Sequence, residues 1–256
     1  MSERPARRPA VVTGASSGIG AATAQTLAAT GYPVALGARR IERCQEVAAR
    51  IHAHGGEAVV HPLDLTDPAS VEAFAQAVTD DLGTVEVVVS NAGRVAPGVV
   101  HEVDAATFAA ELDLNLLGAH RLVRAFVPGM VERRRGDVVF VSSDVAVRSR
   151  PFMSAYTAAK WGLEGMAHAM QMELEGTGVR ASIVRPGPTS SEMGSDWDAV
   201  EGGRTIEAWV RFGQARHSSF LPPEAVAGAI AAIVNAPPGT HLNLVEVTPE
   251  APVEDR

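Results

Sequence analysis

A tyrosine and a lysine stand four residues apart in the segment Tyr156-Thr157-Ala158-Ala159-Lys160. On a helix, residues at this spacing lie on one face, one turn from each other. An ammonium beside a phenol favours the phenolate and lowers a pKa that is ordinarily about 10. Such a phenol can exchange a proton with a carbonyl or alcohol oxygen. The pair therefore predicts general acid–base chemistry, although the same spacing also occurs in inert surface pairs.

The bulk properties indicate a globular chain and argue against a polyanionic macromolecular partner. Its 256 residues are 46% hydrophobic and carry a formal net charge of −8, which argues against partners such as nucleic acid or an anionic membrane. The single cysteine, Cys44, cannot form an intrachain disulfide or a multi-cysteine metal site. The eight histidines show no metal-ligand spacing, so we expect no metal. With no apolar run long enough for a membrane span and no signal peptide after the basic residues 1–9, we expect a cytoplasmic protein.

Short valine-rich runs alternate with longer helical patterns, which indicates a parallel sheet with crossover helices. Most of the runs lack polar alternation, as expected for strands covered on both faces. The predicted strands are Ala10–Thr13, Val34–Leu36, Ala58–Pro62, Val85–Val89, Val138–Val141, Val179–Val184 and His241–Val247. The predicted helices are Ile19–Thr30, Ile41–His54, Ser70–Leu82, Ala106–Arg134, Ser154–Gly176 and Pro223–Asn235. Only Thr189–Phe220 departs from this alternation, and no composition shift marks a second domain.

A glycine-rich segment follows the first predicted strand and opens the first helix. Glycines there allow a tight turn and let backbone N–H groups approach a pyrophosphate at the helix N-terminus. A generic glycine-rich turn is the alternative, but the position after the first buried strand favours dinucleotide binding. The predicted contacts in this loop are Gly14, Ser16, Ser17, Gly18, Ile19 and Gly20.

The end of the second strand selects the cofactor. A carboxylate at this point would bind a ribose 2′-hydroxyl and repel a 2′-phosphate, but the chain carries Arg39 and Arg40 there. Guanidinium groups suit phosphate through their forked donors. The alternative is a solvated arginine pair at a helix start, where the helix dipole disfavours cations. We therefore predict NADP(H) in preference to NAD(H).

The ends of the third and fourth strands carry further candidate cofactor contacts. Asp64 could accept from an adenine amino group, whereas Asp67 precedes Pro68 and reads as a helix N-cap. Small residues after the fourth strand let the chain pass close to a ribose, and Asn91 could tie neighbouring strand ends together. The predicted contacts at these two ends are Asp64, Leu65, Asn91, Ala92 and Gly93.

Five blocks, in register over about residues 10 to 248, resemble the short-chain dehydrogenase/reductase family. The resemblance implies one Rossmann-type domain over residues 1–256: a doubly wound α/β fold with a seven-stranded parallel sheet and helices on both faces. The blocks are Thr13–Gly20, Asp64, Asn91 to Gly93, Ser143 with Tyr156 and Lys160, and Pro186-Gly187.

The same resemblance implies an active-site tetrad of Asn115, Ser143, Tyr156 and Lys160. Tyr156 would be the general acid in reduction and the base in oxidation. Lys160 would lower its pKa and bind the nicotinamide ribose, and Ser143 would hydrogen-bond the substrate oxygen. Asn115 would hold a water that relays protons, or would only satisfy local backbone groups.

Pro186 and Gly187 would cover the nicotinamide, with either Ser191 or Thr189 holding its carboxamide. Residues 189–220 would form the substrate lid. Asp144 could touch a polar substrate group or only start a loop. The lid side chains could line a site for a fairly apolar substrate or only pack the lid onto the body. They are Met193, Trp197, Trp209, Phe212 and His217.

These features predict an NADP(H)-dependent oxidoreductase that acts on CH–OH donors, either a carbonyl reductase or an alcohol dehydrogenase. A non-catalytic NADP(H)-binding regulator on the same fold is the main alternative, although such proteins typically lose the tyrosine or lysine. An epimerase or a C=C reductase fits less well, because these usually have a longer chain or an altered Ser/Tyr spacing. The resemblance also implies a homotetramer, or a dimer, that pairs through Ala106–Arg134 and Ser154–Gly176.

Overall fold

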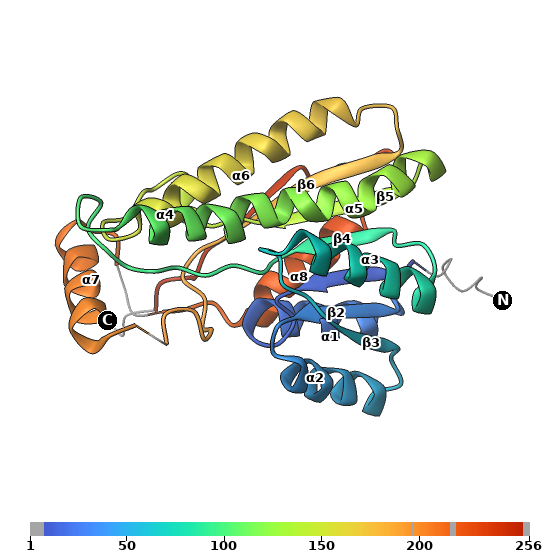
Figure 1. The fold of residues 1–256 in the computed structure, drawn as a ribbon, viewed down its shortest axis with the longest axis horizontal. Coiled ribbons are helices and arrows are strands. Elements are labelled where there is room, and N and C mark those ends of the chain that lie inside the picture. Colours follow the sequence, from blue (N-terminus) through green and yellow to red (C-terminus); the bar gives the residue numbers. More distant parts are fainter. Residues whose placement is uncertain (1–7, 196, 216–218, 253–256) are drawn as a thin grey trace.

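The computed structural model of the chain describes residues 8–195, 197–215 and 219–252. Seven parallel strands form one sheet in the order β3-β2-β1-β4-β5-β6-β7 (Figure 1). This confirms the predicted doubly wound fold. The strands are β1 (Ala10–Thr13), β2 (Val34–Ala38), β3 (Ala58–Pro62), β4 (Val87–Ser90), β5 (Gly136–Val141), β6 (Val179–Pro186) and β7 (Leu244–Val247).

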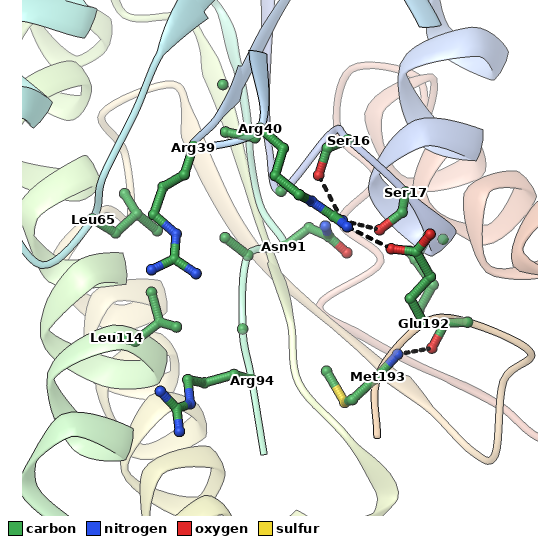
Figure 2. Close-up of a pocket in the computed structure, with 18 of the residues that line it drawn as sticks. Ser16, Ser17, Arg39, Arg40, Leu65, Asn91, Arg94, Leu114, Glu192 and Met193 are labelled. Atoms are coloured by element: carbon green, nitrogen blue, oxygen red, sulfur yellow. Dashed lines mark hydrogen bonds and ion pairs between the residues drawn. The ribbon is translucent and has the colours of Figure 1, made fainter. Parts of the chain in front are cut away.

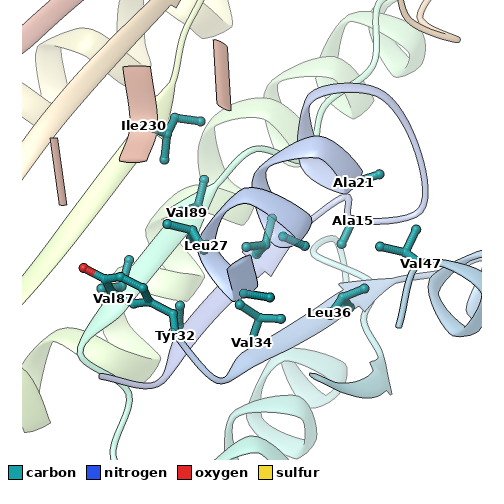
Figure 3. Close-up of a cluster of buried hydrophobic side chains, with 14 of the residues drawn as sticks. Ala15, Ala21, Leu27, Tyr32, Val34, Leu36, Val47, Val87, Val89 and Ile230 are labelled. Atoms are coloured by element: carbon teal, nitrogen blue, oxygen red, sulfur yellow. The ribbon is translucent and has the colours of Figure 1, made fainter. Parts of the chain in front are cut away.

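Helices cover both faces of the sheet, α1, α2 and α8 on one side and α3, α5 and α6 on the other (Figure 1). Each layer has its own apolar core, and Figure 3 shows the first, where Leu27 of α1 and Ile230 of α8 pack. The helical segments are α1 (Gly18–Ala29), α2 (Ile41–Ala53), α3 (Pro68–Leu82), α4 (Ala105–Leu112), η1 (Asp113–Leu117), α5 (Gly118–Arg133), η2 (Asp144–Ala146), α6 (Ser154–Glu173), α7 (Ala199–Arg211) and α8 (Pro223–Val234).

The strands lack polar alternation because both of their faces are buried. Val11 and Val12 are neighbours in β1 and both are fully buried. Successive side chains of a strand point to opposite faces. Val11 accordingly joins the core beneath α3, α5 and α6, and Val12 joins the core beneath α1, α2 and α8.

The strand order reverses between β1 and β4, which lie side by side in the sheet. From β1 the chain proceeds to β2 and β3 in one direction and then returns to β4 on the other side. In open parallel sheets, ligands bind at such a switch point, outside the carboxyl ends of the strands. The glycine-rich loop after β1 and the segment after β4 therefore face the same crevice.

Two predicted elements differ from the structure. The helix predicted as Ala106–Arg134 is interrupted by η1, a turn of π-helix at Asp113–Leu117 that contains Asn115. The residues predicted as a lid contain a helix, α7, whose N-cap Asp198 accepts hydrogen bonds from Val200 N and Glu201 N. Both differences concern segments around the site.

Within the described ranges, none of the helices has the length and apolar character needed to cross a bilayer. Three or more metal-binding side chains do not gather at any point of the same ranges. Trp161 on α6 is 55% exposed and donates its indole N–H to Val145 O at 3.2 Å. The homo-oligomer remains a prediction.

Candidate active site

A cavity of about 380 Å³ opens at the carboxyl ends of β1, β2, β3 and β4 (Figure 2). This volume lies within the range of small-molecule sites. Most of the residues predicted to contact a dinucleotide line it. They are Gly14, Ser16, Ser17, Gly18, Ile19, Arg39, Arg40, Asp64, Leu65, Asn91, Ala92, Gly93 and Ser191, together with the lid residue Met193. The sequence analysis missed other lining residues, among them Arg94, Val95, Leu114 and Glu192.

The glycine-rich loop leaves no room for side chains at two positions. Gly14 has φ +64°, and a Cβ there would lie 2.9 Å from Ala92 Cα. A Cβ on Gly20 would lie 2.3 Å from Gly14 O, so Gly20 supports the loop from behind and does not line the cavity. The loop thus brings backbone against the N-terminus of α1, the arrangement that binds a pyrophosphate.

Arg39 and Arg40 leave the end of β2 in different directions (Figure 2). Arg40 donates to Ser16 Oγ at 3.0 Å and Ser17 Oγ at 2.9 Å. Its other terminal nitrogen pairs with Glu192 of the lid at 2.7 Å, and Glu192 also binds Arg43. Arg39 extends toward the side of Leu65. Two hydroxyls beside a guanidinium form a donor set that fits a phosphate. In the structure, the Glu192 carboxylate neutralises the Arg40 guanidinium of this set.

The carboxyl ends of β3 and β4 are held by local hydrogen bonds. Asp64 Oδ1 accepts from the Thr66 hydroxyl at 2.7 Å and from Thr66 N at 2.9 Å, and these bonds lower the pKa of Asp64. Asp67 caps α3 as predicted by accepting from Ala69 N. Asn91 Nδ2 donates to Thr13 O at 2.8 Å, which confirms that this amide ties β4 to β1.

The segment after β6 lies beside the glycine-rich loop. Ser191 Cβ is 3.1 Å from the position that a Cβ on Gly18 would take. Gly187 N donates to Val247 O at 2.8 Å, and Thr189 Oγ1 donates to Gly187 O at 2.9 Å. Pro186, Gly187 and Thr189 do not line the cavity, whereas Ser191 does. Both Ser191 and Thr189 remain predicted cofactor contacts.

Ser143, Tyr156 and Lys160 meet where β5 ends and α6 begins. Ser143 follows β5, and its hydroxyl lies close enough to the Tyr156 phenol to lower the pKa of that phenol. Ser143 Oγ donates to Asp144 Oδ1 at 3.3 Å. Tyr156 and Lys160 lie on one face of α6, with Lys160 Nζ 5.5 Å from the Tyr156 ring centroid. Lys160 Nζ donates to Val141 O, the last carbonyl of β5, at 2.8 Å. Both side chains are buried, at 5% exposed for Tyr156 and 3% for Lys160.

Burial dominates the electrostatics of this pair. It raises the pKa of Tyr156, and the nearby Ser143 hydroxyl only partly opposes the shift. Burial also lowers the pKa of Lys160 to about 8. The net direction for Tyr156 is opposite to the one expected from the sequence, because an enclosed phenolate loses more hydration than its neighbours return. In the protein without bound cofactor, the Tyr156 phenol is therefore held in its protonated form.

Asn115 lies in the π-helical turn and is 2% exposed. Its Nδ2 donates to Glu111 O at 2.9 Å and to Arg94 O at 3.0 Å, and its Oδ1 accepts from Arg94 N at 3.2 Å. The side chain thus fastens the segment after β4 to the helix. Its contacts are with backbone groups, which is the second of the two roles that the sequence analysis leaves open for Asn115. The π-helical turn that carries Asn115 is a feature frequent at functional sites.

Two lid indoles pack against the cluster that contains Tyr156. Trp197 and Trp209 pack edge to face at 6.2 Å and contact the apolar cluster that contains Tyr156. Trp197 Nε1 donates to Val95 O at 3.1 Å, and Trp209 Nε1 donates to Pro151 O at 3.0 Å. The predicted lid residue Phe212 is 62% exposed and faces outward, and His217 lies outside the described residues.

An ion pair flanks the same cluster. Asp144, beside Ser143, pairs with Arg150, and Arg150 stacks over the Trp209 ring at 5.1 Å. Burial raises the pKa of Asp144. Asp144 is therefore part of the wall around Tyr156, whereas the sequence gives no sign of its partner Arg150.

The site also holds charged groups that the sequence analysis missed. Glu111 is fully buried one turn before Asn115. Glu164 is buried one turn after Lys160 and forms a two-bond pair with Arg185 at 2.6 and 3.0 Å. Spacing is the one available signal, because both glutamates stand four residues from a predicted site residue.

Comparison with known proteins agrees with this geometry. The short chain dehydrogenase family model matches residues 8–202. The glycine betaine reductase of Emericella nidulans is 34% identical over 241 residues, which cover 94% of this chain but 18% of that protein. The chain therefore spans less than a fifth of that relative's length.

Two solved structures superpose over almost the whole chain. An alcohol dehydrogenase from the archaeon Thermococcus sibiricus, complexed with 5-hydroxy-NADP, has TM-score 0.82 and 28% identity and covers 98% of this chain and 100% of its own. An actinorhodin polyketide ketoreductase with NADPH has TM-score 0.85 and 27% identity and covers 97% and 98%. Both superpose on the sheet whose carboxyl edge holds the cavity.

Proposed function

The chain belongs to the short-chain dehydrogenase family, and we propose that it is an NADP(H)-dependent oxidoreductase that interconverts a ketone or aldehyde and its alcohol. One juxtaposition carries the proposal. A buried tyrosine, close to the Ser143 hydroxyl and one turn from a buried lysine, stands at the same edge of the sheet as the dinucleotide-type cavity. The names of the superposed alcohol dehydrogenase and ketoreductase support the same chemistry.

Tyr156 supplies the proton in this proposal. When bound, the cofactor supplies a hydride to the carbonyl carbon. The oxygen then takes the proton of the Tyr156 hydroxyl, and the Ser143 hydroxyl stabilises the developing negative charge. A raised pKa suits this direction, because the phenol remains protonated until an acceptor arrives. Oxidation needs the phenolate, so it depends on higher pH or on added positive charge beside the ring.

The substrate is proposed to be fairly apolar. The cluster around Tyr156 consists of Val95, Val145 and Met153, with Trp197 and Trp209 packed against it. The Asp144–Arg150 pair adds one polar element to this wall without net charge. The lid indoles pack against the cluster that contains Tyr156, so we expect the lid to move when substrate enters.

A panel of ketones, aldehydes and secondary alcohols, assayed by NADPH and NADH absorbance, tests the function. We expect turnover of at least one apolar carbonyl compound with NADPH. Tight NADPH binding without turnover across the panel would instead support the non-catalytic regulator, the alternative on the same fold.

Arg40 is expected to decide the cofactor preference. Arg40→Ala removes the guanidinium that joins Ser16 and Ser17, so the dissociation constant of NADPH should rise roughly tenfold to a hundredfold while that of NADH stays nearly constant. Titration calorimetry measures both constants. Arg133→Ala, an exposed arginine at the far end of α5, is the charge-matched control. Equal loss of NADH affinity in Arg40→Ala would contradict a 2′-phosphate contact.

Glu192 is expected to weaken NADPH binding, whereas Arg40 strengthens it. Its carboxylate binds both Arg40 and Arg43, so an incoming phosphate must displace it. Glu192→Gln should tighten NADPH binding up to about fivefold, the limit for exposed ion pairs. The gain should shrink at high salt, because salt screens the competing pair. Weaker NADPH binding in Glu192→Gln would show that this carboxylate assists the cofactor.

A further inference from the structure

Glu111 is a carboxylic acid enclosed entirely by protein. It lies near the end of α4, is 0% exposed, and precedes Asn115 by one turn. Burying a carboxylate is costly unless the surroundings compensate its charge. Neither the hydride transfer nor the cofactor cavity, as described above, uses this residue. Its retention at the centre of the site needs an explanation.

The contacts of Glu111 satisfy one oxygen and leave the other available. Oε1 accepts from Ala96 N at 3.0 Å and lies 3.3 Å from Arg94 Nε. Oε2 is buried and has no hydrogen-bond partner within the part of the chain that the structure describes. Arg94 is 54% exposed on the rim of the cavity, so solvent partly screens the charge that it offers Glu111 Oε1.

Lys160 is a buried cation on α6, the helix that packs against the segment carrying Glu111. Helix α4 and η1 pack against α6, and Glu111 and Glu164 are the two carboxylates that favour the Lys160 ammonium. Glu164 is already engaged by Arg185 and by the Ser142 hydroxyl at 2.7 Å. Glu111 therefore has the carboxylate oxygen that is still free to respond to Lys160.

We propose that Glu111 is a positioning residue of the active site, whose buried carboxylate holds the Lys160 side chain in its ammonium form. The proposed function supplies the reason, since a charged Lys160 is required beside Tyr156. The ammonium donates to Val141 O at 2.8 Å, and this bond fixes the lysine one turn from the phenol.

The charges around the pair place its titration near neutrality. Burial raises the pKa of Glu111 to about 7, against the opposing effects of Arg94 and Lys160. Burial lowers the pKa of Lys160 to about 8, and Glu111 and Glu164 oppose that shift. Asp144 and Arg150 face Tyr156 from the other side with opposite signs. Loss of the Glu111 charge should therefore lower the Lys160 pKa further.

The chain offers a direct probe, because Lys160 is its only lysine. Protein labelled with ¹³C at the lysine Cε gives one side-chain resonance, whose shift with pH reports the Lys160 charge without any assignment or substrate. We expect a wild-type midpoint at about pH 8 and a smaller step near pH 7, where Glu111 gains its proton.

Glu111→Gln should move the Lys160 midpoint to lower pH by about one unit. Glu111→Asp, which keeps the charge, should restore it toward the wild-type value. Asp113→Asn is the matched control, because Asp113 carries the same charge two residues away and pairs with Arg121 at 2.7 Å. It should leave the midpoint unchanged.

Equal midpoints in Glu111→Gln and Asp113→Asn would overturn the proposal. If Glu111→Gln fails to fold, the wild-type titration decides alone: a single step, with no second inflection where Glu111 titrates, would also overturn it. The readout needs no turnover, so a shifted lysine in a protein that reduces no carbonyl compound would sink the proposed function and leave this inference standing.

Discussion

Tyr156→Phe is expected to lower kcat/KM for carbonyl reduction by about a hundredfold to ten-thousandfold, the usual contribution of a general acid. Phenylalanine keeps the ring within the cluster of Val95, Val145 and Met153 but removes the phenol hydroxyl beside Ser143. The Kd of NADPH should change little, because Tyr156 does not line the cavity that the glycine-rich loop forms. Steady-state kinetics beside a binding titration separates the two effects.

The chain has two tyrosines, and the other one, Tyr32, provides a matched control. Tyr32 is 7% exposed and donates its hydroxyl to Asn235 Oδ1 at 3.0 Å, far from the lid. Tyr32→Phe should cost about 1 kcal/mol of stability and leave kcat/KM unchanged. Comparable activity of Tyr156→Phe and wild type would remove Tyr156 from the mechanism.

The strands and the glycine-rich loop could be predicted because each depends on local chemistry. A valine run such as Val85–Val89 reads as a buried strand from its composition alone, and β4 occupies Val87–Ser90 within two residues of that prediction. The loop was predictable because its backbone tolerates no Cβ at Gly14 or Gly20. Glycine is therefore required at both positions and is visible in the sequence. The spacing of Tyr156 and Lys160 likewise follows from helix geometry.

The π-helical turn could not be predicted, because its cause lies elsewhere in the chain. Asn115 reaches the backbone of Arg94 after β4, a contact between residues far apart in sequence. The lid helix α7 was missed for a local reason. It contains Gly202 and Gly203, which are poor helix formers, and it begins at Asp198 in a segment that otherwise reads as a polar loop.

The buried charged residues were the largest group of site residues that the sequence analysis did not predict. Glu111 stands two residues before Asp113 on a helix, and nothing in that pattern says that the first is fully enclosed while the second is half-buried. Arg185 directly follows the predicted end of a valine-rich strand, where a charge suggests an exit to solvent. Sequence spacing identifies neighbours along one helix but not the elements that cover them.

Arg185→Met is expected to destabilise the protein by about 3 kcal/mol, the cost of leaving a buried charge uncompensated. Arg185 is 9% exposed and binds Glu164 through two hydrogen bonds at 2.6 and 3.0 Å. It also reaches Glu246 of β7 at 3.3 Å, so the pair joins α6, β6 and β7 behind Lys160. Urea unfolding followed by circular dichroism measures the change.

The double variant Glu164→Leu/Arg185→Met separates two quantities: the net contribution of the ion pair to the free energy of unfolding, and the cost of leaving one buried charge without its partner. Two apolar side chains leave no buried charge of the pair without a partner, and Glu246, which loses Arg185, is partly exposed. Most of the lost stability should therefore return, except about 1 kcal/mol for the Ser142 hydroxyl that donates to Glu164. Arg43→Met, which breaks a half-exposed pair with Glu192, should change stability by less than about 0.5 kcal/mol. A double variant as unstable as Arg185→Met would mean that the lost packing of the arginine stem, and not the stranded carboxylate, destabilises this layer.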